Sequence, residues 1–210
     1  EAVDTLITHP KVKTVSFVGS TPIAKYIYET ATQNGKRVQA AGGAKNYLIV
    51  MPDADTDSTI DAIMGSAYGC AGERCMAGSV LVCVDNAGKN LLPPLSDVSR
   101  SLRVGATERD PDAQMGPVVT QQHLDRIHTC ISEGLDEGAS LLVDGREVVV
   151  EDTPNGFYLG PTIFDQVTPK MNVAQTEIFG PVLATMHTDD LETAIAYCNG
   201  SGYGNAAVLF

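Results

Sequence analysis

The chain has 210 residues, of which 43% are hydrophobic, enough to bury a sizeable core in one large domain or in parts of two. Its formal net charge of −12, from 26 acidic and 14 basic residues, disfavours nucleic acid and anionic membranes as partners. No apolar run reaches the roughly 18 residues that a transmembrane helix requires, so we expect no membrane partner. Five cysteines without paired metal spacing indicate reduced thiols in a cytosol-like compartment.

Strand-like and helix-like segments alternate from the start of the chain, which predicts an α/β fold. The run TVSFV at residues 14–18 is β-branched and aromatic and predicts a buried strand. Apolar residues at helical spacing predict a helix over residues 21–33, with Thr21 as its N-cap and Pro22 as its first residue. The glycine between the two segments, Gly19, predicts a tight turn from strand to helix.

The same alternation continues through the rest of the chain. Predicted strands cover residues 47–51 and 80–84, and strand or loop segments cover residues 150–165 and 181–188. Predicted helices cover residues 59–71, 120–137 and 191–198. The chain opens at Glu1 in an amphipathic stretch and stops inside a predicted buried strand at residues 206–210. Natural ends seldom fall within a core strand, so we expect a piece of a longer polypeptide, with a short natural protein as the alternative.

The segment Gly69–Ser79 carries the chemistry-bearing residues. Its glycines allow close approach of the backbone, and nearby amides favour the nucleophilic thiolate form of a cysteine. Taken alone, however, a cysteine beside alanines is more often a small core residue. The residue types here therefore predict a nucleophile at Cys75 only in combination with a wider pattern.

That wider pattern is present in four ordered segments. The spacing Tyr68-x-x-x-Gly72-Glu73-x-Cys75-Met76-Ala77-x-Ser79 resembles the cysteine signature of the aldehyde dehydrogenase superfamily. Three more segments resemble, in order, its cofactor-phosphate turn, its interdomain segment and its nicotinamide-side motif: Phe17–Thr21, Gly42–Asp55 and Glu177–Pro181. The resemblance implies the end of a Rossmann-type, NAD-binding domain at residues 1–44, followed by most of an α/β catalytic domain at residues 45–210.

The resemblance also implies roles for single residues. It implies Cys75 as the catalytic nucleophile, whose backbone N–H is a candidate oxyanion donor. It implies that Gly19 and Ser20 hold the pyrophosphate of NAD at a helix N-terminus, that Glu177 accepts from the nicotinamide ribose and that Phe179 borders the nicotinamide. Without the resemblance, Gly19 and Ser20 would be interpreted as an ordinary strand-to-helix connection, Glu177 as an exposed acid and Phe179 as a core aromatic.

Two kinds of enzyme within the family differ in the step that releases the acyl group from the catalytic cysteine. Hydrolytic members place a water-activating glutamate before the paired glycines, whereas this chain has Ala40 and Ala41 there. A site without that base suits a thiol acceptor such as coenzyme A, which is itself a strong nucleophile. The alternatives are a hydrolytic enzyme that takes its base from elsewhere, or a non-catalytic fragment such as a thiol redox sensor that uses Cys70 and Cys75.

Three segments, Gly72–Ala77, Gly42–Asn46 and Val50–Asp55, together resemble the CoA-acylating methylmalonate-semialdehyde dehydrogenase branch. That resemblance implies malonate or methylmalonate semialdehyde as substrate, and Arg74 as a substrate-binding residue that holds its carboxylate, with a structural arginine as the alternative. It also implies a homodimer or homotetramer for the full-length protein, in the cytoplasm or, in a eukaryote, in the mitochondrial matrix. We expect the isolated chain to turn over poorly, because further parts of such a site lie outside it.

The remaining histidines and cysteines receive no catalytic role. His123 and His128 are five residues apart on a predicted helix and do not share a face, so we assign no metal. Cys70 is predicted to pack as a small apolar residue. The other three cysteines are predicted to lie in the core: Cys83, Cys130 and Cys198.

Overall fold

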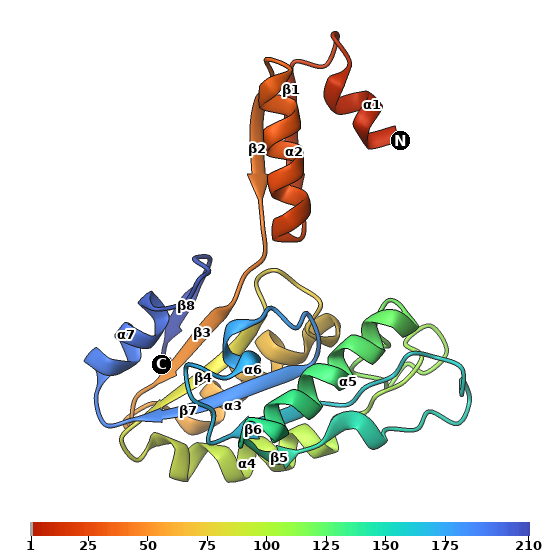
Figure 1. Ribbon diagram of the computed structural model, residues 1–210. Helices are drawn as coiled ribbons and strands as arrows, with labels where there is room; N and C mark the ends of the chain where they lie inside the picture. The colour runs from red at the N-terminus through yellow and green to blue at the C-terminus, as the bar shows by residue number, and fades with distance from the viewer. Residues whose placement is uncertain (1) are drawn as a thin grey trace. The chain divides into compact units, whose positions relative to one another are not determined.

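The computed structural model describes residues 2–210 and divides into two compact units, residues 1–44 and 45–210 (Figure 1). Within residues 2–210, no helix has both the length and the apolar character needed to cross a membrane. The start of the chain at Glu1 lies outside the described residues, and the amphipathic stretch after it forms helix α1, Ala2–Thr8. Each unit has its own buried core.

The first unit is a small β-α-β arrangement. Strand β1 (Thr14–Val18) pairs in parallel with β2 (Arg37–Ala41), and helix α2 (Thr21–Gln33) connects them. The expectation that residues 14–18 form a buried strand is wrong for this unit, because only alternate residues are shielded and Val18 is 66% exposed. The helix N-cap is Ser20 rather than Thr21, which is already helical.

The second unit is built on a six-stranded sheet with the order β5-β6-β7-β4-β3-β8. All neighbouring strands are parallel except β5 and β6. The strands are β3 (Asn46–Val50), β4 (Gly78–Val84), β5 (Ser140–Val143), β6 (Thr162–Asp165), β7 (Val182–Thr188) and β8 (Ala207–Leu209). The α-helices are α3 (Thr56–Tyr68), α4 (Ala87–Ser101), α5 (Gln121–Asp136), α6 (Asn172–Gln175) and α7 (Leu191–Asn199), and two 3-10 turns cover Gly69–Gly72 and Gly145–Glu147.

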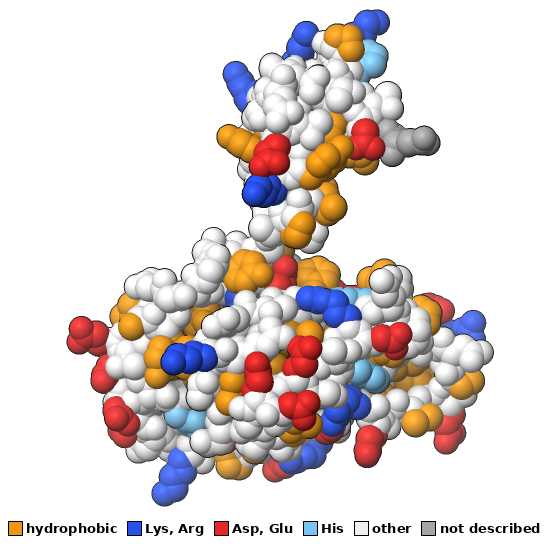
Figure 2. Space-filling view, in the orientation of Figure 1, with side chains coloured by type: hydrophobic (Ala, Val, Ile, Leu, Met, Phe, Trp, Pro, Cys, Tyr) orange, Lys and Arg blue, Asp and Glu red, His pale blue; other side chains and the backbone are white. Residues whose placement is uncertain are grey.

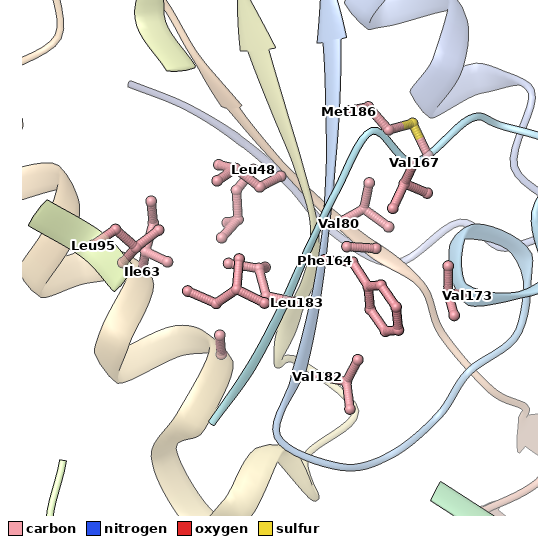
Figure 3. Close-up of a cluster of buried hydrophobic side chains, with 14 of the residues drawn as sticks. Leu48, Ile63, Val80, Leu95, Phe164, Val167, Val173, Val182, Leu183 and Met186 are labelled. Carbon is pink, nitrogen blue, oxygen red and sulfur yellow. The ribbon is translucent and has the colours of Figure 1, made fainter. Parts of the chain in front are cut away.

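Helices cover both faces of this sheet. The α-carbon of Gly134 on α5 faces the ring of Phe164, whereas that of Gly88 on α4 faces Cys83 and His187. In the sheet register, Phe164 pairs with Ala184 of β7, and Cys83 pairs with His187 of β7. Because side chains alternate between the two faces along a strand, residues three positions apart point to opposite faces. Helices α5 and α4 therefore lie on opposite faces of the sheet. Figure 3 shows the side chains buried between these layers, among them Leu48, Val80 and Leu183. A sheet buried on both faces explains why β4 is an almost unbroken apolar run.

The sequence located most of these elements. The predicted α/β fold is confirmed, and each predicted strand or helix of the second unit has a counterpart. The helix predicted at residues 59–71 instead spans Thr56–Tyr68, because Asp55 caps it by accepting from the Ser58 amide and the backbone turns left-handed at Cys70. The buried strand predicted at residues 206–210 is wrong for this chain, since β8 lies at the sheet edge with all three residues exposed.

The acidic character predicted from composition is spread over the surface. On the face drawn in Figure 2, acidic and basic side chains of the second unit are interspersed rather than gathered by sign. Several basic groups already pair with acids, for example Arg103 with Asp110 and Arg146 with Asp144. The net charge therefore marks no single binding patch on this face.

Candidate active site

Cys75 lies at the tip of a tight turn just before strand β4. The turn is closed by the Ala77 amide, which donates to the carbonyl oxygen of Arg74 at 3.0 Å. Cys75 and Met76 are its two central residues, and both are exposed. The backbone N–H of Cys75 makes no hydrogen bond to residues 2–210, so a donor stands free beside the thiol.

The chain reaches this turn through a short left-handed stretch. After α3 ends at Tyr68, the φ angles of Cys70, Ala71 and Gly72 are 53°, 53° and 69°. The expectation that Cys70 packs as a small apolar residue is wrong, because the side chain projects from this loop and is exposed. Of the cysteines predicted to lie in the core, Cys83 and Cys130 are buried, whereas Cys198 is half-buried.

Arg74 is fixed by the end of helix α3. Its Nη2 atom donates to the carbonyl oxygens of Gly65 at 2.6 Å and Ser66 at 2.9 Å. These carbonyls belong to the last turn of the helix, where a cation is favoured. This geometry supports the structural alternative for Arg74, and carboxylate binding by the rest of the guanidinium stays a prediction.

Two asparagine side chains hold the carbonyl oxygen of Cys75. Asn46 Nδ2 donates to it at 2.9 Å and Asn205 Nδ2 donates at 2.8 Å. Asn46 also donates to Ala77 O at 2.8 Å and accepts from the Ala206 amide at 3.1 Å, so it joins the starts of β3, β4 and β8. Sequence reasoning missed both asparagines, because the group they bind is a backbone carbonyl.

A cavity of about 460 Å³ lies between the start of β3, the end of α7 and the segment before β8. Lys45 and Tyr47 from the start of β3 line it, together with Tyr203 and Asn205 from the segment before β8. Asn205, one of the two residues that donate to the Cys75 carbonyl, is thus part of the cavity wall.

The predicted nicotinamide-side segment contacts the Cys75 loop directly. A Cβ atom on Gly72 would lie 2.3 Å from the carbonyl oxygen of Gly180, so only glycine fits there. The loop that carries Cys75 therefore packs against the segment Glu177–Pro181 through Gly72 and Gly180, and a shared site for Cys75, Glu177 and Phe179 stays a prediction. These two motifs are about a hundred residues apart in the chain.

Basic side chains contact four consecutive carbonyl oxygens, from Thr176 to Phe179. Lys45 Nζ donates to Thr176 O at 2.8 Å, and Arg126 donates to Glu177 O and Ile178 O, each at 2.8 Å. His123 Nε2 lies 2.6 Å from Phe179 O. Because residues 176–179 form neither helix nor strand, these contacts take the place of the hydrogen bonds that regular secondary structure would give their carbonyls.

The held segment presents two of the predicted cofactor-binding side chains. The carboxylate of Glu177 makes no hydrogen bond or ion pair with residues 2–210. Phe179 has φ 59° and is 38% exposed, with the His123 ring against its edge at a centroid distance of 6.3 Å. An unpaired carboxylate and a projecting aromatic ring fit the ribose and nicotinamide roles that the resemblance implies.

Glu73 and His123 connect the two halves of the site. Glu73 Oε1 accepts from the Val119 amide at 3.2 Å and lies 3.5 Å from His123 Nε2. Burial raises the pKa of the Glu73 carboxyl, while the Val119 amide and His123 oppose that shift. Within the described residues, no group of three potential ligands is arranged to hold a metal ion.

The remaining predicted residues, Gly19 and Ser20, lie in the first unit. The Gly19 amide donates to Ala41 O at 3.1 Å, which joins the end of β1 to β2. Ser20 is the N-cap of the 13-residue helix α2, yet its hydroxyl makes no capping hydrogen bond. A free hydroxyl and uncapped amides at a helix N-terminus are compatible with a bound pyrophosphate.

Comparison with known proteins defines the class. The aldehyde dehydrogenase family model matches residues 1–210, and the chain belongs to that family. It is 48% identical over its whole length to malonate-semialdehyde dehydrogenase 1 of Oceanobacillus iheyensis, of which it covers 43%. It is 45% identical to the human mitochondrial methylmalonate-semialdehyde/malonate-semialdehyde dehydrogenase [acylating], of which it covers 39%.

Solved structures agree with the fold. The crystal structure of methylmalonate-semialdehyde dehydrogenase from Oceanimonas doudoroffii superposes with a TM-score of 0.96 at 46% identity, over all of this chain and 43% of that one. Betaine aldehyde dehydrogenase from Staphylococcus aureus, in complex with NAD+, gives 0.94 at 30% identity, over all of this chain and 41% of that one. The chain thus spans about two fifths of the length of these relatives.

Proposed function

We propose that the protein carrying this chain oxidises malonate or methylmalonate semialdehyde with NAD and transfers the acyl group to coenzyme A. The observation that carries the proposal is the exposed thiol of Cys75, next to a free backbone N–H, on a loop that packs against Gly180 of the segment Glu177–Pro181. The similarity to semialdehyde dehydrogenases at 45–48% identity supports this substrate class.

Covalent chemistry starts at Cys75. Its thiolate adds to the aldehyde carbon, and the carbonyl oxygen becomes the oxyanion of a tetrahedral thiohemiacetal. The free N–H of Cys75 is available to donate to that oxyanion, and one such donor contributes roughly 3 kcal/mol in related chemistry. Asn46 and Asn205 hold the carbonyl oxygen of the same residue, which restrains rotation about its Cα–C bond.

NAD, when bound, supplies the hydride acceptor. Glu177 would hold the nicotinamide ribose through its unpaired carboxylate, and Phe179 would border the ring. Ser20 and the first amides of α2, beside Gly19, would bind the pyrophosphate. Lys45, Arg126 and His123 keep Glu177 and Phe179 in place through the backbone.

The acyl group leaves Cys75 by transfer to a thiol. Ala40 and Ala41 carry no group that can activate water, whereas a coenzyme A thiolate needs little activation. For malonate semialdehyde the overall reaction is aldehyde, NAD+ and coenzyme A to acetyl-CoA, NADH and carbon dioxide, which balances in atoms and charge. Arg74 would bind the substrate carboxylate with the guanidinium atoms that α3 leaves free.

The test is a product assay on the complete protein. Malonate semialdehyde and NAD are supplied with and without coenzyme A, and NADH and acetyl-CoA are both quantified. We expect acetyl-CoA in equal amount to NADH, loss of both in Cys75→Ala and retention of both in Cys70→Ala. Turnover that ignores coenzyme A and releases a free carboxylate would identify a hydrolytic enzyme instead.

A further inference from the structure

Both acceptor positions of the Cys75 carbonyl oxygen are occupied by side-chain amides. A carbonyl oxygen has two lone pairs, and the Nδ2 atoms of Asn46 and Asn205 lie 2.9 Å and 2.8 Å away. Asn205 is 130 residues from Cys75 in the chain, so this contact exists only in the folded protein. The turn closed between Arg74 and Ala77 does not require either amide.

The two asparagines differ in what else they do. Asn46 is 4% exposed, and its side chain also donates to Ala77 O and accepts from the Ala206 amide. These bonds connect neighbouring strands, so Asn46 is part of the sheet structure. Asn205 is exposed, and apart from Cys75 O its Nδ2 contacts only Met76 Sδ, at 3.2 Å. Both contacts of Asn205 are therefore to the two central residues of the Cys75 turn.

We propose that Asn205 is a positioning residue for the Cys75 nucleophile. This inference rests on the proposed function of Cys75. The direction of the Cys75 carbonyl relative to its Cα is set by rotation about the Cα–C bond, and the thiol and the free N–H are attached to the same Cα. By holding the carbonyl, Asn205 restrains that rotation and so limits the movement of the Cα that carries the thiol and the N–H.

Asn205 also lines the cavity that Lys45 and Tyr47 line. At the same time, its side-chain amide donates to the carbonyl oxygen of Cys75. A contact made only for stability would not need to stand at an exposed position. Removal of the Asn205 amide leaves the Asn46 bonds, so the sheet should persist while the turn gains freedom.

The experiment acetylates the 210-residue chain with p-nitrophenyl acetate. The thiolate attacks the ester carbonyl, p-nitrophenolate leaves, and the acetylation rate at each cysteine is read from its peptides by mass spectrometry. This reaction forms an oxyanion at the same place as the aldehyde reaction and needs no cofactor. The variants are Asn205→Leu, which keeps the approximate size, and Asn205→Gln, which keeps the amide.

Two cysteines serve as internal controls. Cys70 is exposed five residues earlier in the same loop, so it reports general accessibility. Cys83 is fully buried in β4, so its acetylation reports unfolding. We expect Asn205→Leu to slow acetylation of Cys75 about fivefold relative to Cys70, the factor of one hydrogen bond, with Cys83 still protected. Asn205→Gln should recover part of the rate.

The outcomes separate the two proposals. If Cys75 of the unaltered chain reacts faster than Cys70 and Asn205→Leu leaves the ratio unchanged, the inference on Asn205 is overturned alone. A parallel change of Cys70 and Cys75 also overturns it, because that result describes a purely structural contact. If Cys75 reacts no faster than Cys70 in the unaltered chain, the nucleophile proposal fails and the inference fails with it.

Discussion

Lys45 donates from its Nζ to the carbonyl oxygen of Thr176 at 2.8 Å, directly before Glu177, from a side chain that is only 2% exposed. Burial lowers the pKa of this amine to about 7, and the charges of Cys130 and Glu177 offset the shift only in part. No carboxylate of the described residues forms a salt bridge with it. A neutral amine still donates to the carbonyl, so the contact persists across neutral pH.

This lowered pKa predicts a pH-dependent stability. Between about pH 7 and the ordinary lysine value of 10.5, the unfolded chain binds the proton that the folded chain releases. The free energy of unfolding therefore rises with pH through this window, by up to about 1.4 kcal/mol per pH unit from this one group. Below pH 7 both states are charged, and the full cost of burying the ammonium remains.

Lys45→Met should remove this dependence. We expect the variant to be the more stable protein at pH 6, and its advantage should shrink as the pH approaches 8.5. Urea unfolding of both chains at four pH values gives the difference between their free energies of unfolding. The contributions of the histidines cancel in this difference, because both chains contain them. An equal substitution at exposed Lys89 is the control, and a constant difference between the Lys45 chains at all pH values would contradict the prediction.

A second prediction concerns the close approach of two backbones at Gly72. Its φ of 69° is strained for other residues, and an added Cβ would meet the Gly180 carbonyl oxygen at 2.3 Å. Gly72→Ala should lower the free energy of unfolding by about 2–4 kcal/mol, since neither backbone can yield cheaply. It should also slow the reaction of Cys75 with p-nitrophenyl acetate, because it separates the Cys75 loop from the Glu177 segment.

Gly65 provides the matched control for this change. It lies in helix α3, seven residues earlier, and a Cβ there would meet nothing within 4 Å. Gly65→Ala should stabilise the chain by up to about 1 kcal/mol through helix propensity. If both variants were equally stable in urea unfolding, the contact between Gly72 and Gly180 would not matter for the fold.

The sequence predicted the family and the α/β fold because each motif is a local arrangement of residue types. The cysteine segment and the segment Glu177–Pro181 were assigned to one site from the resemblance, and the fold brings them together. Apolar residues at helical spacing predicted helix α5, and a continuous apolar run predicted strand β4.

What the sequence missed depends on backbone geometry. The groups held by Asn46, Asn205 and Arg126 are main-chain carbonyls, which look alike at every position of a sequence. The left-handed φ of Cys70 likewise follows from the fold around it rather than from its residue type. Helix α4 went unpredicted because Pro93 and Pro94 lie in its interior, a pattern that normally marks a loop.

Arg126 supplies a third prediction. Its two terminal nitrogens hold the carbonyls of Glu177 and Ile178, so Arg126→Met removes two hydrogen bonds from one irregular segment. We expect faster amide hydrogen exchange in residues 176–181, measured by mass spectrometry, with the β4 peptide unchanged. Arg100→Met, which frees the Leu142 carbonyl elsewhere, should leave residues 176–181 unaffected. Unchanged exchange in Arg126→Met would mean that Lys45 and His123 suffice.

A fourth prediction distinguishes a structural role of Arg74 from a substrate-binding role. Its Nη2 binds two carbonyls at the end of α3, so Arg74→Met should lower the free energy of unfolding of the chain by about 1–3 kcal/mol. Arg74→Lys keeps a cation that can reach these carbonyls but loses the Nε and Nη1 donors that remain free for a carboxylate. If Arg74 also binds substrate, Arg74→Lys of the complete protein should raise the KM for malonate semialdehyde about tenfold and leave that for propanal, which has no carboxylate, nearly unchanged. Equal changes in the two KM values would assign Arg74 to the loop alone, because a loosened Cys75 turn affects every aldehyde alike.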